Sequence, residues 1–283
     1  MGKLLKIELK RALGSWEFYI VIMAGCLMGV LAFFDTSGFI LAKNWYKYMH
    51  GDEMAAMIIE KMNMVDTPLE IWMPRYGSSS TFYNTWITLL PVLTVIPFGI
   101  EYAREKRNGL INQYMIRIKR STYYASKFIT TFISGGLVAV IPLVFNLLLV
   151  MCFLPWGMPL RATNLYPVID GNVFNKIFYN MPAWYVVIYL IYDFVLFGLI
   201  SCIALCFVYI EENIFALTIT PFILYFSEHV LLTFGLGFAG ISLMNNASLY
   251  NTYYNHVGAL LIQFTVLIFM DATFFYRIRK DVV

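Results

Sequence analysis

The sequence predicts an all-α integral membrane protein with six transmembrane helices, an N-terminal interfacial helix and a cytoplasmic helix between the second and third spans. Of its 283 residues, 60% are hydrophobic and 13% are charged, too few charges to cover the apolar surface of a soluble domain. Several apolar runs reach the ~20 residues that a helix needs to cross the hydrocarbon core. Strand-sized segments of alternating polarity are absent from the sequence, which favours helices over a β-barrel.

Six apolar runs along the chain are predicted to cross the membrane. The second and third contain proline, which a membrane helix tolerates because neighbouring helices can satisfy the freed carbonyl groups. Residues 233–256 include an apolar stretch only half as long as a span, so we expect a re-entrant or interfacial segment on the outer side. The predicted spans are Glu17–Phe34, Asn84–Ile100, Ser126–Leu154, Pro182–Tyr209, Asn213–Leu232 and Val257–Tyr276.

The distribution of Lys and Arg sets the expected orientation. Fourteen of the 20 basic residues fall in segments that share a side with the N-terminus, and six fall in segments on the other side. Because basic segments are retained in the cytoplasm, both termini are expected there. Residues 35–83 then form the longest extracellular loop.

Residues 1–16 are basic and helix-periodic. Leu5, Leu9, Ala12 and Leu13 share one side of a helix, and lysines lie beside them. We expect an interfacial amphipathic helix on the inner leaflet or a basic tail that enforces topology, and the two roles are compatible. No small-residue cleavage site follows the first apolar run, so the segment is not interpreted as a signal peptide.

The charged segment 101–125 lies between the second and third spans. From Leu110 to Arg120 the apolar residues fall within an arc of about 140° on a helical wheel, and only Ile116 lies outside it. Gly109 precedes the arc, where a backbone bend or a close approach favours a residue without a side chain. The pattern predicts a short amphipathic helix that contacts either the inner leaflet or a groove on a soluble partner. The arc consists of Leu110, Ile111, Tyr114, Met115 and Ile118.

This segment resembles the coupling-helix region of type-2 ABC transporter permeases. The run EKRNGL at residues 105–110 precedes the predicted helix, and STYY at residues 121–124 and Lys127 follow it. The N-terminal helix, the six spans and the two cytoplasmic termini also resemble this family, so the resemblance covers residues 1–283 as a single transmembrane permease domain. It implies a multi-pass subunit of an exporter in the bacterial cytoplasmic membrane.

The resemblance also implies partners. The chain has no G-x-x-x-x-G-K-[ST] run, so it is not expected to be an enzyme, and ATP and Mg²⁺ are expected in a separate ATPase subunit present in two copies. A second permease half, either a second copy of this chain or a close relative, would complete the pathway, and no nucleic acid is expected as a partner. The residues expected to contact the ATPase are Glu105, Gly109, Leu110, Tyr114, Met115 and Ile118.

Three ionisable residues, Asp193, Glu228 and His229, lie within or near the ends of predicted spans. A carboxylate at the bilayer centre costs about 2.5–3.5 kcal/mol, so these side chains are expected to face protein or water. They are candidates for lining the transport pathway, and the alternative is a structural hydrogen bond between helices. No metal site is predicted, because the 4 cysteines lie in apolar runs and are interpreted as packing residues.

The cargo is predicted from the apolar and aromatic character of the chain. In the outer loop Met54, Met57, Ile58, Met62 and Val65 recur at helical spacing and predict an amphipathic helix, which we interpret as a lid on its own spans rather than a direct substrate site. The 24 Phe and 20 Tyr residues suit an amphipathic or hydrophobic cargo, above all a bacteriocin or toxin peptide. Lipid or drug export by the same fold remains open.

Two functions of other classes are an intramembrane protease and a sensor or immunity protein. Glu211 and Glu212 are similar to the paired glutamates of membrane-embedded CAAX-type proteases, but the matching basic and His residues are missing at the required depth. A membrane sensor or immunity protein that sequesters peptide would share the outer loop but would not need an ATPase-docking helix. A neighbouring gene for a stand-alone ATPase would favour transport.

Overall fold

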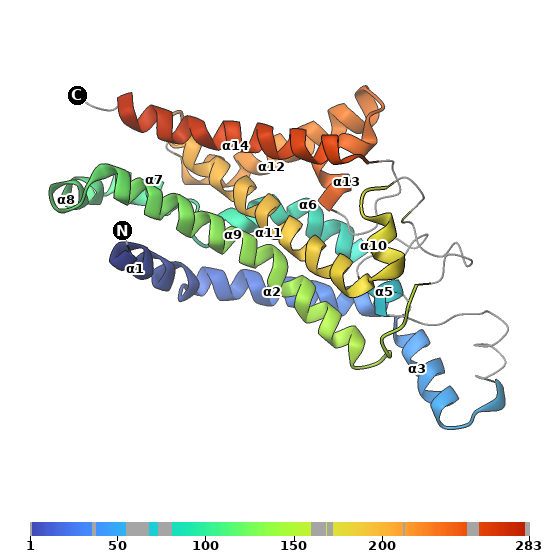
Figure 1. The fold of residues 1–283 in the computed structure, drawn as a ribbon. Coiled ribbons are helices and arrows are strands. Elements are labelled where there is room, and N and C mark those ends of the chain that lie inside the picture. Colours follow the sequence, from blue (N-terminus) through green and yellow to red (C-terminus); the bar gives the residue numbers. More distant parts are fainter. Residues whose placement is uncertain are drawn as a thin grey trace.

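The computed structural model describes residues 2–35, 38–54, 68–72, 81–159, 168, 172–211, 213–247 and 255–280. This part of the chain forms helices and contains no strand. Both chain ends and α8 lie at one end of the bundle, and α3 and α10 lie at the other (Figure 1). The helices are α1 (Gly2–Leu13), α2 (Trp16–Asp35), α3 (Gly38–Met49), α5 (Pro68–Ile71), α6 (Thr81–Val95), α7 (Glu101–Arg107), α8 (Leu110–Arg117), α9 (Arg120–Met151), α10 (Asn175–Asn180), α11 (Pro182–Phe207), α12 (Ile214–Val230), the π-helix η2 (Leu231–Gly235), the 3₁₀-helix η3 (Ala239–Ile241), α13 (Leu243–Ala247) and α14 (Val257–Lys280).

Four helices of the described chain are long and apolar enough to cross a membrane, which supports the prediction of an integral membrane protein. The other two predicted spans correspond to α6, which has 15 residues, and to the apolar part of α14 over Val257–Thr273. Both are shorter than a usual span, so six crossings remain a prediction. The four long apolar segments are Trp16–Phe34, Arg120–Met151, Pro182–Phe207 and Ile214–Gly235.

The helix α6 ends earlier than the predicted second span because of its local sequence. Pro97 has no N–H and disfavours helical geometry at the residue before it, so the helix stops at Val95. The chain then forms a turn in which the N–H of Gly99 donates to the carbonyl of Val95 at 2.8 Å. This turn leads directly into α7, the first helix of the charged segment.

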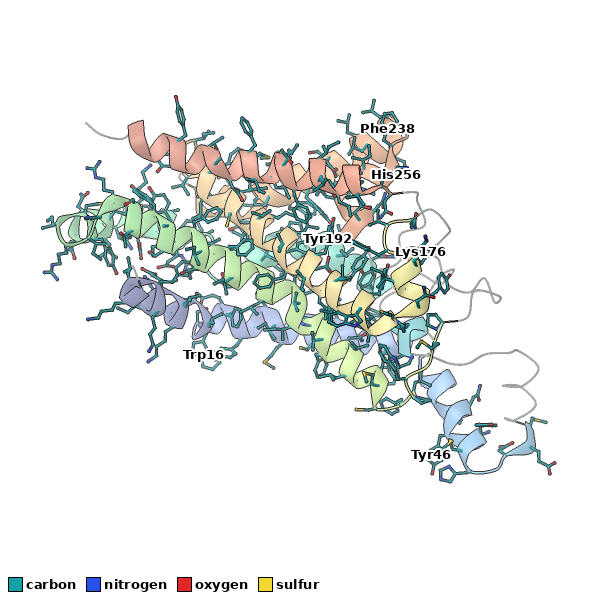
Figure 2. The ribbon with its side chains drawn as sticks, in the orientation of Figure 1. Trp16, Tyr46, Lys176, Tyr192, Phe238 and His256 are labelled. Atoms are coloured by element: carbon teal, nitrogen blue, oxygen red, sulfur yellow. The ribbon has the colours of Figure 1, made fainter. Side chains whose placement is uncertain are left out.

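Large apolar side chains project from the outer surfaces of the bundle. Trp16 and Met23 on α2 are 81% and 71% exposed, and Phe215 on α12 and Phe269 on α14 are each 73% exposed. Trp16 lies on the outer side of its helix in Figure 2. Such surfaces are unfavourable in water but suit contact with lipid, in agreement with the long apolar helices.

The centre of the bundle is the close contact between α9 and α11, the most extensive helix pair in the described chain. Ser201 on α11 donates from its hydroxyl group to the carbonyl oxygen of Thr131 on α9 at 3.1 Å. A Cβ atom on Gly136 of α9 would lie only 2.6 Å from the carbonyl oxygen of Phe194 on α11. A small residue is therefore needed here, as is common where two membrane helices approach closely.

The segments outside the long helices differ from the predictions in several ways. The helix expected from Leu110 to Arg120 ends at Arg117, where Ile118 turns to extended geometry, and α9 begins already at Arg120. The segment predicted as the outer loop contains α3, which the sequence pattern did not predict. The Met-rich helix predicted in that loop lies outside the described residues, except for Met54.

We predict that Gly136→Ala separates α9 from α11 and lowers stability by about 1–3 kcal/mol, the usual cost of overpacking. The measurement is thermal unfolding of the purified protein in detergent. Gly258→Ala on α14 is the matched control, because a Cβ atom there meets nothing within 4 Å. Equal melting temperatures for the two variants would contradict the close contact.

Candidate functional site

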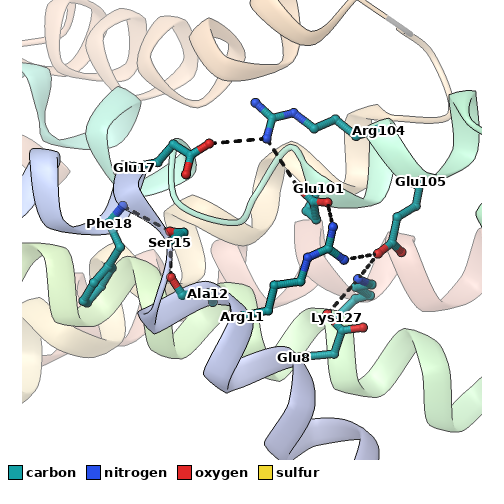
Figure 3. A network of polar contacts seen from close by, with 10 residues as sticks. All are labelled: Glu8, Arg11, Ala12, Ser15, Glu17, Phe18, Glu101, Arg104, Glu105 and Lys127. Atoms are coloured by element: carbon teal, nitrogen blue, oxygen red, sulfur yellow. Dashed lines mark hydrogen bonds and ion pairs between the residues drawn. The ribbon is translucent and has the colours of Figure 1, made fainter.

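A buried lysine joins the N-terminal helix to the charged segment. The side chain of Lys127, near the start of α9, is 0% exposed. Its ammonium group lies 3.0 Å from a carboxylate oxygen of Glu8 on α1 and 2.8 Å from a carboxylate oxygen of Glu105 on α7 (Figure 3). Both carboxylates are almost completely buried as well. Three helices that are distant in sequence therefore meet at one ammonium group.

A second cation extends this contact towards the surface. Arg11 on α1 donates to Glu105 at 2.8 Å and also pairs with Glu101. Partial burial acts to lower the pKa of Arg11, but the charges of Glu101 and Glu105 and the hydrogen bond to Glu105 outweigh it and raise the pKa above its usual value. Arg104 lies 3.4 Å from Glu101 and 3.8 Å from Glu17 on α2. We call Glu8, Arg11, Glu101, Glu105 and Lys127 the ion network.

Glu105 is the most connected member of the ion network. Besides the two cations, it accepts a hydrogen bond of 2.5 Å from the hydroxyl group of Tyr123 on α9. The ring of Phe98 lies 4.9 Å from the Lys127 ammonium group and covers it. Removing charges from water costs several kcal/mol per ion, which is offset only when each charge is well paired. The close pairing of Glu105 and Lys127 meets this condition.

The ion network lies beside α8, whose orientation is fixed by its two ends. Gly109 precedes the helix with φ +70°, a left-handed geometry that is costly for other residues. On the inner side of α8, Ile111, Tyr114 and Met115 pack on a cluster of tyrosines from α7 and α9. The rings of Tyr114 and Tyr123 are 5.5 Å apart between centroids. Burial, followed by the charge of Glu105, raises the pKa of Tyr114, so this phenol stays neutral.

The outward side of α8 is different from the predicted apolar arc. Ile116, the one residue outside that arc, is 85% exposed, and Leu110 at the edge of the arc is 36% exposed. At 100° per residue, Ile116 and Gln113 lie at the centre of the outward side and are flanked by Asn112 and Arg117. We call these four residues and Leu110 the outward face. It is mixed in polarity, with one large apolar side chain at its centre.

The residues predicted to contact an ATPase are thus divided between two environments. Glu105 is buried, with its side chain 1% exposed, and its carboxylate contacts Lys127, Arg11 and Tyr123, so it offers little surface to a partner. Tyr114, Met115 and Ile118 are partly buried, so most of their surface faces the chain itself. Those that remain exposed are Gly109 and Leu110.

The three predicted pathway residues differ in their contacts. Glu228 and His229 on α12 both reach Ser242, at 3.4 Å and 2.9 Å from its hydroxyl oxygen. Glu228 also accepts from the backbone N–H of Leu243 at 3.1 Å. This contact folds the segment after η2 back onto α12. Asp193 on α11 is buried, and its Oδ1 atom has no hydrogen-bond partner within the described chain.

No metal centre is built by the residues that the structure describes. Among them, no group of three or more His, Cys, Asp or Glu side chains is arranged to hold an ion. Cys202 and Cys206 are free thiols buried between helices, in agreement with their interpretation as packing residues. The ion network itself contains three carboxylates and two bound cations of the chain, and its carboxylates are directed at those cations.

The ion network was not predicted from the sequence, although the sequence of α1 contains one signal for it. Glu8 is the only acidic residue in α1, and it lies one turn from Leu4 and one turn from Ala12. These three residues form the buried stripe of α1, which packs on α9. An acidic residue in the middle of an apolar stripe indicates a buried basic partner. Nothing in the local pattern names Lys127 as that partner.

Comparison of the chain with protein-family models, with curated proteins and with solved structures found no match. The function is therefore inferred from the residues and contacts of the chain itself. The observations that bear on it are the ion network, the position of α8 and the exposure of the outward face.

We predict that Lys127→Met destabilises the protein by about 3–5 kcal/mol, because it leaves the buried Glu8 without its ion-pair partner and Glu105 with Arg11 alone. Lys119→Met is the matched control, since Lys119 is exposed at the same end of the bundle. Chemical unfolding of the purified protein in detergent measures both. Adding Glu8→Gln and Glu105→Gln to Lys127→Met removes the charges of the two buried carboxylates. The triple variant is expected to regain most of the lost stability. Equal unfolding midpoints for Lys127→Met and Lys119→Met would contradict the role of the ion network.

Proposed function

We propose that this chain is the six-span permease half of an ATP-driven exporter, and that α8 docks a separate ATPase subunit through its outward face. The observation that carries the proposal is the way α8 is held. α8 is a short helix between α7 and α9, and an exposed isoleucine lies at the centre of its outward side. The two neighbouring helices are joined by the buried ion pair of Glu105 and Lys127. Such an arrangement is suited to transmit force between a soluble partner and the membrane.

The stiffness of the connection supports this role. The chain between α8 and α9 consists of only Ile118, which is in extended geometry, and Lys119, which has φ −59° and ψ 132°. On the other side, Asn108 and Gly109 join α7 to α8. A rigid-body movement of α8 would therefore pull directly on α9, a helix of 32 residues that forms the centre of the bundle.

The composition of the outward face supports docking to protein. Ile116 provides one large apolar anchor, and the neighbouring amide side chains of Asn112 and Gln113 can donate and accept hydrogen bonds. An apolar anchor within a polar rim is typical of protein interfaces. A helix lying on lipid would instead be expected to expose a broad apolar face. The side of α8 with the broad apolar face packs on its own chain.

The remaining parts of the proposal follow from the resemblance to type-2 ABC permeases. Two ATPase subunits would bind ATP and Mg²⁺, and a second permease half, most simply another copy of this chain, would complete the pathway. The end with α8 and both termini would face the cytoplasm of a bacterium. The cargo would be an amphipathic peptide such as a bacteriocin or toxin, with lipid or drug export as the alternative. A sensor or immunity protein without an ATPase is the competing function.

We predict that Ile116→Asp reduces co-purification of the ATPase roughly ten-fold, equivalent to ~1.4 kcal/mol, and abolishes transport. The fold is expected to remain intact, because Ile116 is 85% exposed. The measurement is co-purification from detergent with the ATPase encoded beside the chain, followed by a transport assay.

Two control variants locate the effect. Ile116→Leu keeps an apolar anchor and is expected to bind as the wild type does. Tyr114→Asp places a charge in the packed inner side of α8. It is expected to lower the stability of the protein rather than to remove a docking contact. Full co-purification and full transport by Ile116→Asp would refute the proposed docking face. Failure of the wild type to bind any ATPase would favour the sensor or immunity function.

A further inference from the structure

A cavity of about 630 Å³ lies between α11, α12 and α14, away from the ion network. Its walls are almost entirely apolar, and its size is typical of sites for drug-sized ligands. The helices α12 and α14 both pack on α11 but hardly contact each other, so the space between them remains open. The lining includes Ile200, Leu224, Tyr225, Val266, Leu267 and Met270.

Among the described residues that line this cavity, Glu228 is the only one with a carboxylate. It is partly buried and accepts hydrogen bonds from the backbone N–H of Leu243 at 3.1 Å and from the hydroxyl group of Ser242 at 3.4 Å. Neither donor carries a charge. No ion pair involves Glu228 within the described part of the chain, and the neighbouring His229 contacts Ser242 at 2.9 Å. The carboxylate therefore has hydrogen bonds but no counter-charge.

Gln263 on α14, another polar side chain of the cavity wall, makes hydrogen bonds within the chain. Its amide nitrogen donates to the carbonyl of Ile241, and its amide oxygen accepts from the hydroxyl group of Tyr192 at 3.2 Å. These contacts hold η3 and α14 together at one end of the cavity. Among the described lining residues, Glu228 is the acidic group that a ligand of positive charge would meet.

We propose that this cavity binds a lipophilic organic cation, with its apolar body among the walls and its charge near the carboxylate of Glu228. A phosphonium or quaternary ammonium group has no N–H and needs no hydrogen-bond acceptor, so it does not compete with Leu243 or Ser242 for lone pairs. The attraction between opposite charges is strong in the low dielectric of this site. The ring of Tyr225 and the thioether of Met270 offer polarisable surface that suits a diffuse positive charge.

The inference concerns binding alone and does not depend on the proposed function. A chain that never contacts an ATPase would still contain the cavity and Glu228. If both proposals hold, lipophilic cations are either a class of cargo or ligands that compete with it.

The test compares two probes of nearly the same shape and opposite charge, tetraphenylphosphonium and tetraphenylborate. Each is titrated into the full-length protein in nanodiscs of zwitterionic lipid, and partitioning into empty nanodiscs is subtracted. The variants are Glu228→Gln, which keeps the shape of the side chain and one acceptor oxygen, and Val266→Trp, which fills the cavity from a position that is 52% exposed. Glu211→Gln is the matched control, because it removes an exposed carboxylate next to the other end of α12.

We predict saturable binding of tetraphenylphosphonium to the wild type and to Glu211→Gln, at least about ten-fold weaker binding to Glu228→Gln, and none to Val266→Trp. Tetraphenylborate is expected not to bind above the lipid background. Equal affinity of the cation for the wild type and Glu228→Gln would overturn the proposal, as would saturable binding of the anion. Absence of saturable cation binding to the wild type, or its survival in Val266→Trp, would also overturn it.

Discussion

The buried ammonium group of Lys127 is the constraint on which the charged end of the molecule depends. A lysine that is 0% exposed is tolerated only if carboxylates replace its hydration, and here they come from two other helices. Glu8 fixes α1 against the base of α9, and Glu105 fixes α7 against the same point. Neither helix can shift without separating buried charges. The position of α8 follows, because it is joined to α7 by two residues.

This arrangement assigns Glu105 and Ile116 complementary roles. Glu105 is a positioning residue, since its carboxylate is used by Lys127, Arg11 and Tyr123 inside the chain. Ile116 is the residue that α8 presents to its surroundings. In the proposed exporter, the buried charges keep the docking helix in register with the long helix α9, and the exposed isoleucine provides the contact. The apolar cavity beside Glu228 is a separate site at α11, α12 and α14.

Local sequence patterns predicted some features of the structure but could not predict others. Composition and run length predicted a helical membrane protein, and the wheel of residues 110–120 predicted a short amphipathic helix after Gly109, a glycine that has positive φ in the structure. The wheel of this helix correctly separated its sides, but it could not tell which side would be covered by the chain itself. The contact of Lys127 with Glu8 joins residues 119 positions apart, and periodicity contains no information on such pairs. For the same reason, grouping Asp193 with Glu228 by depth could not indicate that the two side chains make different contacts.

The most direct test of the account is photo-crosslinking from position 116 in native membranes. A photoreactive amino acid in place of Ile116 samples whatever lies against the outward face, and the same residue in place of Ile7, which is exposed on α1, is the control. The account predicts a crosslink from position 116, but not from position 7, to a protein whose sequence contains G-x-x-x-x-G-K-[ST]. Crosslinks from position 116 to phospholipid alone would contradict it and would place α8 on the membrane surface.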